Sequence, residues 1–272
     1  MIRDIFEKTQ RVKPVVHCIT NFVTVNDCAN MVLACGGSPT MAYDLREAED
    51  IAEKADALVL NMGTVSDTDA MILAGRKSNA LHHPIIIDPV GIGGSRLRVD
   101  TFRRLSESMQ FSVIRGNSSE IKAIALGASA IRGVDAAEAD QIREENINEI
   151  VSMAKSLSAK MKSVIIISGP IDIVANAERA YLVRNGHPIM AKVTGTGCMS
   201  TAMLGAFCGA NPRRILEGAL VSTIIMGVSG ELAYAKTLAQ GGGTMTFRMH
   251  LIDEVSMITP EVIHEKMKIE EV

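Results

Sequence analysis

The sequence predicts a single α/β domain in which a mostly parallel central sheet is covered by helices on both faces. Apolar, β-branched runs of strand length alternate with helix-like segments along the chain. The runs are apolar throughout, as in strands that are buried on both faces. The 272 residues, 47% of them hydrophobic, can bury a large core, and no Pro/Gly/Ser-rich linker or internal repeat divides them. We therefore expect one domain spanning residues 1–272.

The predicted elements follow one another in strand–helix order. The predicted strands are VVHCIT (15–20), ALVLN (57–61), PIIIDPV (84–90), FSVIR (111–115) and SVIIISG (163–169). The segments between them that favour helix include residues 25–37, 45–55, 67–81 and 146–161. Beyond residue 170 the pattern changes. Residues 171–186 indicate an antiparallel hairpin, and the chain from Thr196 to the charged tail is predicted to be helical.

Composition and charge argue against several classes of partner. The chain has 28 basic and 31 acidic residues, a formal net charge of −3, and no Lys/Arg run that would follow a nucleic-acid backbone. No apolar stretch approaches the roughly 20 residues that span a bilayer, and the N-terminal segment lacks a signal-peptide hydrophobic region. The five cysteines include no CxxC pair. We expect a cytoplasmic protein with reduced, mostly buried thiols.

The loops that follow the predicted strands contain the polar residues and glycines. They are residues 19–24, 36–42, 61–64, 88–95, 115–120, 168–172 and 193–198. Ligands of open α/β sheets bind beyond the carboxyl ends of the strands, so these loops predict one binding edge.

The loop VTGTGC (193–198) precedes a predicted helix. Gly195 and Gly197 permit a tight turn, and the unpaired amides at the start of the helix suit a phosphoryl group. The alternative is a simple turn in which Cys198 packs as a small hydrophobic residue. The motif is neither a P-loop nor a dinucleotide fingerprint.

Two carboxylates and one arginine belong to neighbouring loops. Asp88 ends an apolar strand and Glu120 begins a helix-like segment, and two carboxylates beside a phosphate suit Mg²⁺. Arg115 offers forked donors to a phosphate. Each residue also has a structural alternative: Glu120 as a helix-start acid, and Arg115 as a surface ion-pair partner.

Together the motifs ITNFVT, GGSPTM, NMGT, DPVG, RGNSSE, SG and VTGTGCM carry a resemblance. In order and approximate spacing, from about residue 14 to 255, they resemble the hydroxyethylthiazole kinases, a branch of the ribokinase-like fold. This resemblance implies a three-layer sandwich. It also implies ATP-dependent phosphorylation of 4-methyl-5-(2-hydroxyethyl)thiazole in thiamine biosynthesis or salvage.

The resemblance also implies roles for individual residues in binding the thiazole and the metal. Met41, Asn21 and Gly195 stand at thiazole-contacting positions. Asp88 and Glu120 stand at the positions of the Mg²⁺ and phosphate carboxylates.

The same resemblance implies how ATP is bound and used. Arg115, Asn117 and Ser168 stand at ATP-contacting positions, with Ser168 where Thr is more usual. Catalysis is assigned to Cys198 and to the turn made by Gly195 and Gly197, whose amides would neutralise charge. A thiol is mostly protonated at neutral pH, so we interpret Cys198 as an assisting group and not as a nucleophile. The family is a homotrimer with substrate pockets at subunit boundaries.

Three alternatives stay open at this point. Kinases of hydroxymethylpyrimidine or pyridoxal, related heterocyclic alcohols, usually carry Asp where Cys198 stands. A non-catalytic nucleotide-binding protein, or a dehydratase of a damaged nicotinamide cofactor, would share the scaffold.

Residues 130–145 are longer and more charged than the resemblance leads one to expect.

Overall fold

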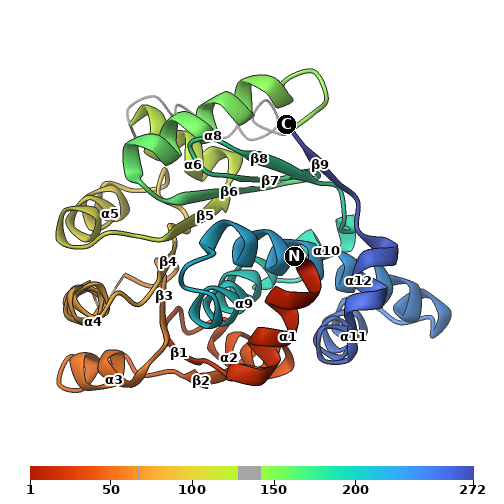
Figure 1. Cartoon of the computed structure of the whole chain (residues 1–272), viewed down its shortest axis with the longest axis horizontal. Helices are drawn as coiled ribbons and strands as arrows, with labels where there is room; N and C mark the ends of the chain where they lie inside the picture. Colours follow the sequence, from red (N-terminus) through yellow and green to blue (C-terminus); the bar gives the residue numbers. More distant parts are fainter. Residues whose placement is uncertain (66–67, 128–141) are drawn as a thin grey trace.

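The computed structural model describes residues 1–65, 68–127 and 142–272. A nine-stranded sheet crosses it in the order β2-β1-β3-β4-β5-β6-β7-β8-β9 (Figure 1). The strands are β1 (Val15–Ile19), β2 (Ser38–Thr40), β3 (Ala57–Asn61), β4 (Ile85–Asp88), β5 (Val113–Asn117), β6 (Val164–Ser168), β7 (Asp172–Ala175), β8 (Ala180–Val183) and β9 (Ile269–Glu271).

Strand pairing confirms the mostly parallel sheet. Strands β1 to β6 pair in parallel, and every residue of β3 and β4 is buried, as their continuous apolar sequences predict. Strands β7 and β8 form the predicted antiparallel hairpin. The chain from Thr196 to the charged tail is helical, as predicted, and within that tail β9 pairs antiparallel with β8.

Helices cover both faces of the sheet (Figure 1). One face carries α1 (Ile2–Val12), α2 (Val25–Ala34), α9 (Thr196–Ala210), α10 (Ile215–Ala239), α11 (Thr244–Met257) and α12 (Pro260–Lys266). The other face carries α3 (Ala48–Lys54), α4 (Thr68–Ala80), α5 (Arg96–Ser108), α6 (Ser118–Leu126) and α8 (Ile147–Met161). A 3₁₀ helix, η2 (Pro188–Lys192), precedes α9. The sheet therefore separates two apolar cores.

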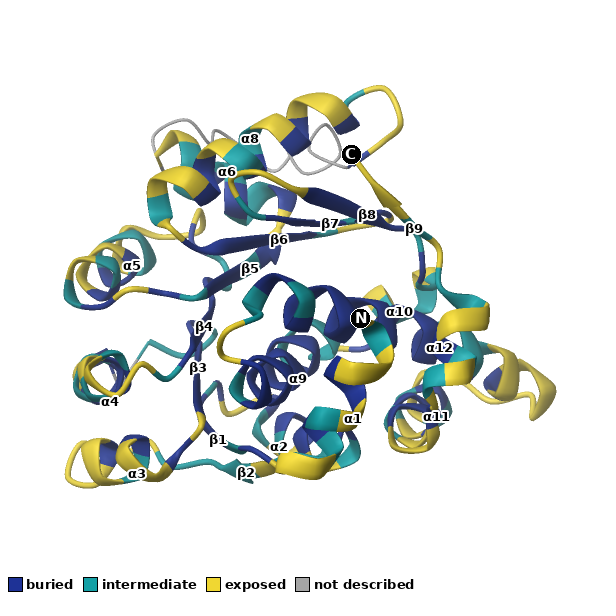
Figure 2. Cartoon of the chain, in the orientation of Figure 1, coloured by how far each residue is buried: buried dark blue, intermediate teal, exposed yellow. Residues whose placement is uncertain are grey.

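Helix α9 is the buried helix that carries the predicted site. It packs against β1, β3 and β4 on one side and against α2 and α10 on the other, and Figure 2 shows it almost wholly buried. A Cβ on Gly205 would lie 2.6 Å from side-chain atoms of both Val16 and Val59, so only glycine allows α9 to approach the sheet this closely. This approach fixes the first turn of α9 against the strand ends.

Helix α10 is longer and more apolar than we expected of any segment of this sequence. Helix α10 has 25 residues and is long and apolar enough to cross a membrane by length and composition, so the expectation that no apolar stretch approaches that length was wrong. Its most apolar window is 78% buried inside the protein, as in a helix of a globular core. The segment 130–145 lies outside the described residues except for 142–145.

Candidate functional site

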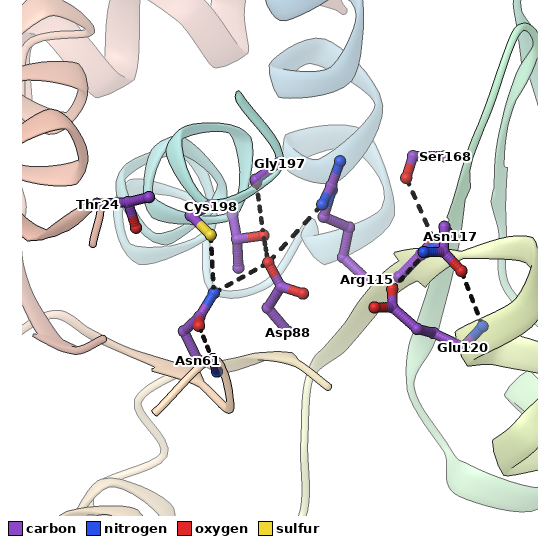
Figure 3. Close-up of polar contacts among 12 residues, drawn as sticks. Thr24, Asn61, Asp88, Arg115, Asn117, Glu120, Ser168, Gly197 and Cys198 are labelled. Atoms are coloured by element: carbon purple, nitrogen blue, oxygen red, sulfur yellow. Dashed lines mark hydrogen bonds and ion pairs between the residues drawn. The ribbon is translucent and has the colours of Figure 1, made fainter. Parts of the chain in front are cut away.

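The carboxyl ends of the parallel strands hold polar residues in matched pairs. The strand register pairs Asn61 with Asp88 and Asn117 with Ser168, and each of the four is the last residue of its strand. The prediction that polar groups collect at one edge of the sheet is confirmed (Figure 3).

A cavity of about 980 Å³ opens at this edge. Its size lies at the upper end of the range of roughly 300–1,000 Å³ that is usual for small-molecule sites. The sequence-predicted site residues that line it are Asn21, Asp88, Arg115, Asn117, Glu120, Ser168, Gly195, Gly197 and Cys198. Residues from six of the seven predicted loops therefore line one cavity, and none of residues 36–42 does.

Asp88 is the buried carboxylate of this site, with 2% of its surface exposed. Its Oδ2 accepts hydrogen bonds from Thr201 Oγ1 at 2.8 Å and from Asn61 Nδ2 at 3.2 Å, and Arg115 Nη1 lies 3.7 Å away. Burial raises the pKa of Asp88 to about 6; Arg115 opposes the rise and the Glu120 carboxylate adds to it. Among the described residues these partners all approach Oδ2, which leaves Oδ1 for a cation or its water.

Asn61 links the carboxylate to the cysteine. Its Nδ2 donates to Asp88 Oδ2 and, at 3.3 Å, to the Sγ of Cys198. Its Oδ1 accepts from Gly63 N at 2.8 Å and from Asn21 Nδ2 at 3.0 Å. Figure 3 shows Asn61 between Asp88 and Cys198. The sulfur thus accepts hydrogen bonds from a polar network, while the half-buried side chain also packs against the core on the α9 face.

The two glycines of VTGTGC are required by close neighbours. Gly195 has φ 91°, and a Cβ there would lie 2.5 Å from Thr24 Cγ2. A Cβ on Gly197 would lie 2.9 Å from Arg115 Nη1. The amide of Met199 donates to the carbonyl oxygen of Gly195, and Gly195 provides no side-chain cap. The preceding amides, 196–198, are those that a helix N-terminus offers to an anion.

Arg115 lies on β5, and Figure 3 shows its guanidinium beside Asp88. Its side chain is 13% exposed, so the alternative of a surface ion-pair partner is wrong. The positive charge lies beside the cavity and partly offsets the Asp88 carboxylate. It is placed to meet an anion that enters the cavity next to the amides of α9.

Glu120 closes a capping box at the start of α6. Its Oε2 accepts from Asn117 N at 2.8 Å, while Asn117 Oδ1 accepts from Glu120 N at 2.9 Å. Its Oε1 accepts from Gly91 N at 2.8 Å, which ties the loop after β4 to α6. The helix-start role is therefore present. Each carboxylate oxygen keeps a second lone pair, so a metal role stays a prediction.

Met41 is the predicted site residue that the structure does not bring to the cavity lining. It is half-buried and packs against the core on the α9 face of the sheet. Close to it in sequence, Phe22 and Tyr43 are exposed and meet edge to face with their ring centroids 5.7 Å apart. A role for Met41 in thiazole binding stays a prediction.

His17 is a buried residue, and the cysteines other than Cys198 are buried thiols, as predicted. His17 is fully buried, its Nε2 lies 2.7 Å from the carbonyl oxygen of Ala42, and burial lowers its pKa. All five cysteines are free thiols, and all but Cys198 are buried.

Three residues of the site were missed by sequence reasoning. Asn61 begins the loop NMGT and faces Asp88 in register, so its position at a strand end was a usable signal. Thr201 lies one turn after Gly197, whose carbonyl it also contacts, and helical spacing places it on the same side of α9. Asp172 lines the cavity and accepts from Gly169 N at 2.9 Å; burial raises its pKa to about 6.

Comparison with known proteins agrees with this geometry. The model of the hydroxyethylthiazole kinase family matches residues 6–261. A hydroxyethylthiazole kinase of Clostridium acetobutylicum is 46% identical over 257 residues, covering 94% of each chain.

Solved structures extend the similarity to the fold. The structure of a hydroxyethylthiazole kinase protein from Pyrococcus horikoshii OT3 superposes with a TM-score of 0.86 at 31% identity, covering 100% of this chain and 98% of the other. A ribokinase-like superfamily protein from Enterococcus faecalis has a TM-score of 0.56 at 14% identity, covering 93% of each chain, and is similar in fold alone. The predicted three-layer, ribokinase-like architecture is confirmed.

Proposed function

Because the chain belongs to the hydroxyethylthiazole kinase family, we infer that it phosphorylates the hydroxyethyl group of 4-methyl-5-(2-hydroxyethyl)thiazole with ATP, in thiamine biosynthesis or salvage. The observation that carries this inference is the convergence of Asp88, Arg115 and the first turn of α9 on one cavity. Phosphoryl transfer needs alignment of the reactants and stabilisation of charge, and these groups supply both.

The phosphates of ATP are assigned to the positive side of the cavity. Arg115 and the amides of residues 196–198 offer donors to them, while Asn117 and Ser168 line the adjacent wall. Gly195 and Gly197 let the phosphate approach the backbone, because a side chain at either position would meet Thr24 or Arg115.

Asp88 and Glu120 are the residues that would hold Mg²⁺. No group of three or more His, Cys, Asp or Glu side chains suited to a metal occurs in the described part of the chain, and Mg²⁺ commonly uses one or two carboxylates plus waters and phosphates. The Oδ1 of Asp88, which bonds to none of the described residues, and the carboxylate pair fit that preference. When bound, the ion neutralises charge on the transferred phosphoryl group.

The reaction is a direct displacement. The alcohol oxygen bonds to the γ-phosphorus, the bond to the bridging oxygen of ADP breaks, and the alcohol proton passes to an oxygen of the transferred phosphoryl group and from there to water. Cys198 lies beside the amides that would hold the phosphoryl group, and its role is to orient the hydroxyl. In a loose transition state the proton need not leave early, so a strong base is not required.

The homotrimer with shared sites remains part of this proposal. Met41 lies outside the cavity of the single chain, as expected if a neighbouring subunit brings its own Met41 to the site. Phe22, Val23, Tyr43 and Leu45 are each at least half exposed, and Val23 also lines the cavity. These apolar side chains suit a subunit contact at the mouth of the site.

Cytoplasmic location and a single catalytic domain over residues 1–272 belong to the same proposal. Free, buried thiols suit a reducing compartment, and one sheet runs through the described chain.

The test is a kinase assay with ATP, Mg²⁺ and three acceptors: the thiazole alcohol, hydroxymethylpyrimidine and pyridoxal. We expect the highest kcat/KM for the thiazole alcohol and a phosphate monoester as product. A higher kcat/KM for either of the others would assign a different substrate. Binding of ATP without turnover of any acceptor would overturn the activity.

A further inference from the structure

Asn61 uses all the hydrogen-bonding capacity of its side chain. An amide has two N–H donors and two acceptor lone pairs, and Asn61 makes the corresponding four contacts described above. Its orientation is not arbitrary. The backbone N–H of Gly63 can only donate, so Oδ1 must face Gly63 and Nδ2 must face Cys198 and Asp88.

Asn21 is fixed in the same way by Thr24. Its Oδ1 accepts from the backbone N and from Oγ1 of Thr24, each at 3.1 Å. Its Nδ2 donates to Asn61 Oδ1 at 3.0 Å and to Cys198 Sγ at 3.3 Å. Only 5% of Asn21 is exposed. Its four sites are occupied within the protein, so a thiazole would have to break one of these contacts to bond to the amide.

Two N–H groups therefore point at the same sulfur. A thiol sulfur has two lone pairs and one hydrogen, and the amides of Asn21 and Asn61 take both lone pairs. Among the described residues Cys198 Sγ accepts these two hydrogen bonds and donates none, and Cys198 lines the cavity. The S–H hydrogen is left to face a ligand.

We propose that Asn21 and Asn61 are positioning residues that donate hydrogen bonds to the sulfur of Cys198 and so fix the direction of its S–H bond. The thiol then donates its hydrogen to the bound ligand and does not accept the proton of the substrate. The identity of that ligand rests on the proposed function. The substrate hydroxyl oxygen and a phosphate oxygen are the acceptors that the S–H would meet in this cavity.

The same pair of amides suits a carboxylate. The side chain that Cys198→Asp introduces would accept both N–H groups through charge-assisted bonds and still keep lone pairs for the alcohol proton. The two amides of Asn21 and Asn61 can thus hold either a thiol or a carboxylate at position 198. A thiol there donates its hydrogen to the ligand, whereas a carboxylate accepts the proton of the alcohol.

The S–H stretching vibration of Cys198 tests the direction of the hydrogen bond without turnover. The band is isolated as the infrared difference between wild type and Cys198→Ala. We expect a band at neutral pH that shifts to lower frequency when the thiazole alcohol and a non-hydrolysable ATP analogue are added. A missing band, or one that responds to neither ligand, would overturn the proposal.

A double-mutant cycle tests the role of the amides. Asn21→Ala removes the N–H that Cys198 accepts, together with the contacts to Asn61 and Thr24 that are the same in both backgrounds. It should lower kcat about 3-fold in the wild type and about 10-fold in the Cys198→Asp background, because charge-assisted bonds are roughly twice as strong. Equal losses in both backgrounds would show that Asn21 does not act through residue 198. Asn211→Ala is the matched control, since Asn211 is 1% exposed and bonds to Ile5, Thr9 and Phe207. It should alter neither the spectrum nor the cycle.

The two tests separate this proposal from the assigned activity. A protein without thiazole kinase activity can still show the S–H band and its response to an anion such as the ATP analogue. If the protein is an active thiazole kinase but lacks the S–H band, the proposed function stands and the proposed role of Asn21 and Asn61 is wrong.

Discussion

The hydroxyl of Thr201 on α9 donates to Oδ2 of Asp88 at the end of β4, across 2.8 Å. This bond connects the helix that carries Cys198 to the strand that carries the candidate metal ligand. It also favours the ionised form of Asp88, yet it does not outweigh burial, since the pKa of Asp88 is raised to about 6.

The raised pKa of Asp88 predicts a stability that depends on pH. Between pH 3.8 and about 6 the folded protein holds a proton that the unfolded chain has released, so this contribution is complete below about pH 4 and is lost as the pH rises towards 6. Without Mg²⁺, Asp88→Asn should therefore be more stable than the wild type above pH 6, by up to about 3 kcal/mol. Urea unfolding at pH 4.5 and pH 7 measures it. If the difference in free energy of unfolding between Asp88→Asn and the wild type were the same at both pH values, Asp88 would be ionised at both.

The capping box predicts a mixed effect for Glu120→Gln. The amide keeps one acceptor oxygen but turns an N–H towards Asn117 N or Gly91 N, so the free energy of unfolding should fall by about 1 kcal/mol. Loss of the carboxylate should lower kcat by about 100-fold at saturating Mg²⁺. Denaturant unfolding and steady-state kinetics separate the two effects. Wild-type kcat in this variant would remove Glu120 from the metal site.

The contacts of Cys198 predict the order of activity of its variants. Cys198→Asp should remain active and turn over at least as fast as the wild type, because Asn21 and Asn61 already offer two donors to a carboxylate. Cys198→Ser should be slower, by about 10-fold, without being inactive. Steady-state kcat measures both. A phosphorylated cysteine trapped during turnover, or an inactive Cys198→Asp that still binds both substrates, would contradict an assisting role.

The position of Met41 outside the cavity sharpens the prediction for its substitution. Met41→Ala should raise KM for the thiazole about 10-fold and leave KM for ATP nearly unchanged, provided that a neighbouring subunit brings Met41 to the site. Initial-rate kinetics and sedimentation of the same samples check this. A parallel rise in both KM values would indicate a loosened fold.

The strands and most of the site could be predicted because short local patterns in the sequence indicate them. The apolar runs of β3 and β4 can only be buried on both faces, and polar residues at strand ends must meet at one edge. Asp88, Arg115 and Cys198 were found in this way, and the close packing of Gly195 and Gly197 explains their place in the motif.

Other features depend on tertiary contacts that a local pattern does not contain. Strand β9 reads IEE, a charged stretch that becomes a strand only because the edge of β8 is free to pair with it. Asn61 reads as an ordinary loop residue until its four partners are present. Helix α10 is hard to recognise in the sequence as one long apolar segment, because Glu217 and Glu231 interrupt it.

The contact between Asn21 and Cys198 joins residues 177 positions apart in the sequence, whereas neighbours in the sheet mostly follow the order of the chain. Pairing of neighbouring strands therefore closes short loops and can spread from one strand to the next. Docking of α9 on the first strands closes a much longer loop and has the larger entropic cost. The site should be among the last parts of the molecule to form. During refolding from denaturant, recovery of the far-ultraviolet circular dichroism signal should precede recovery of thiazole phosphorylation, and an early intermediate would have a sheet but no catalytic centre.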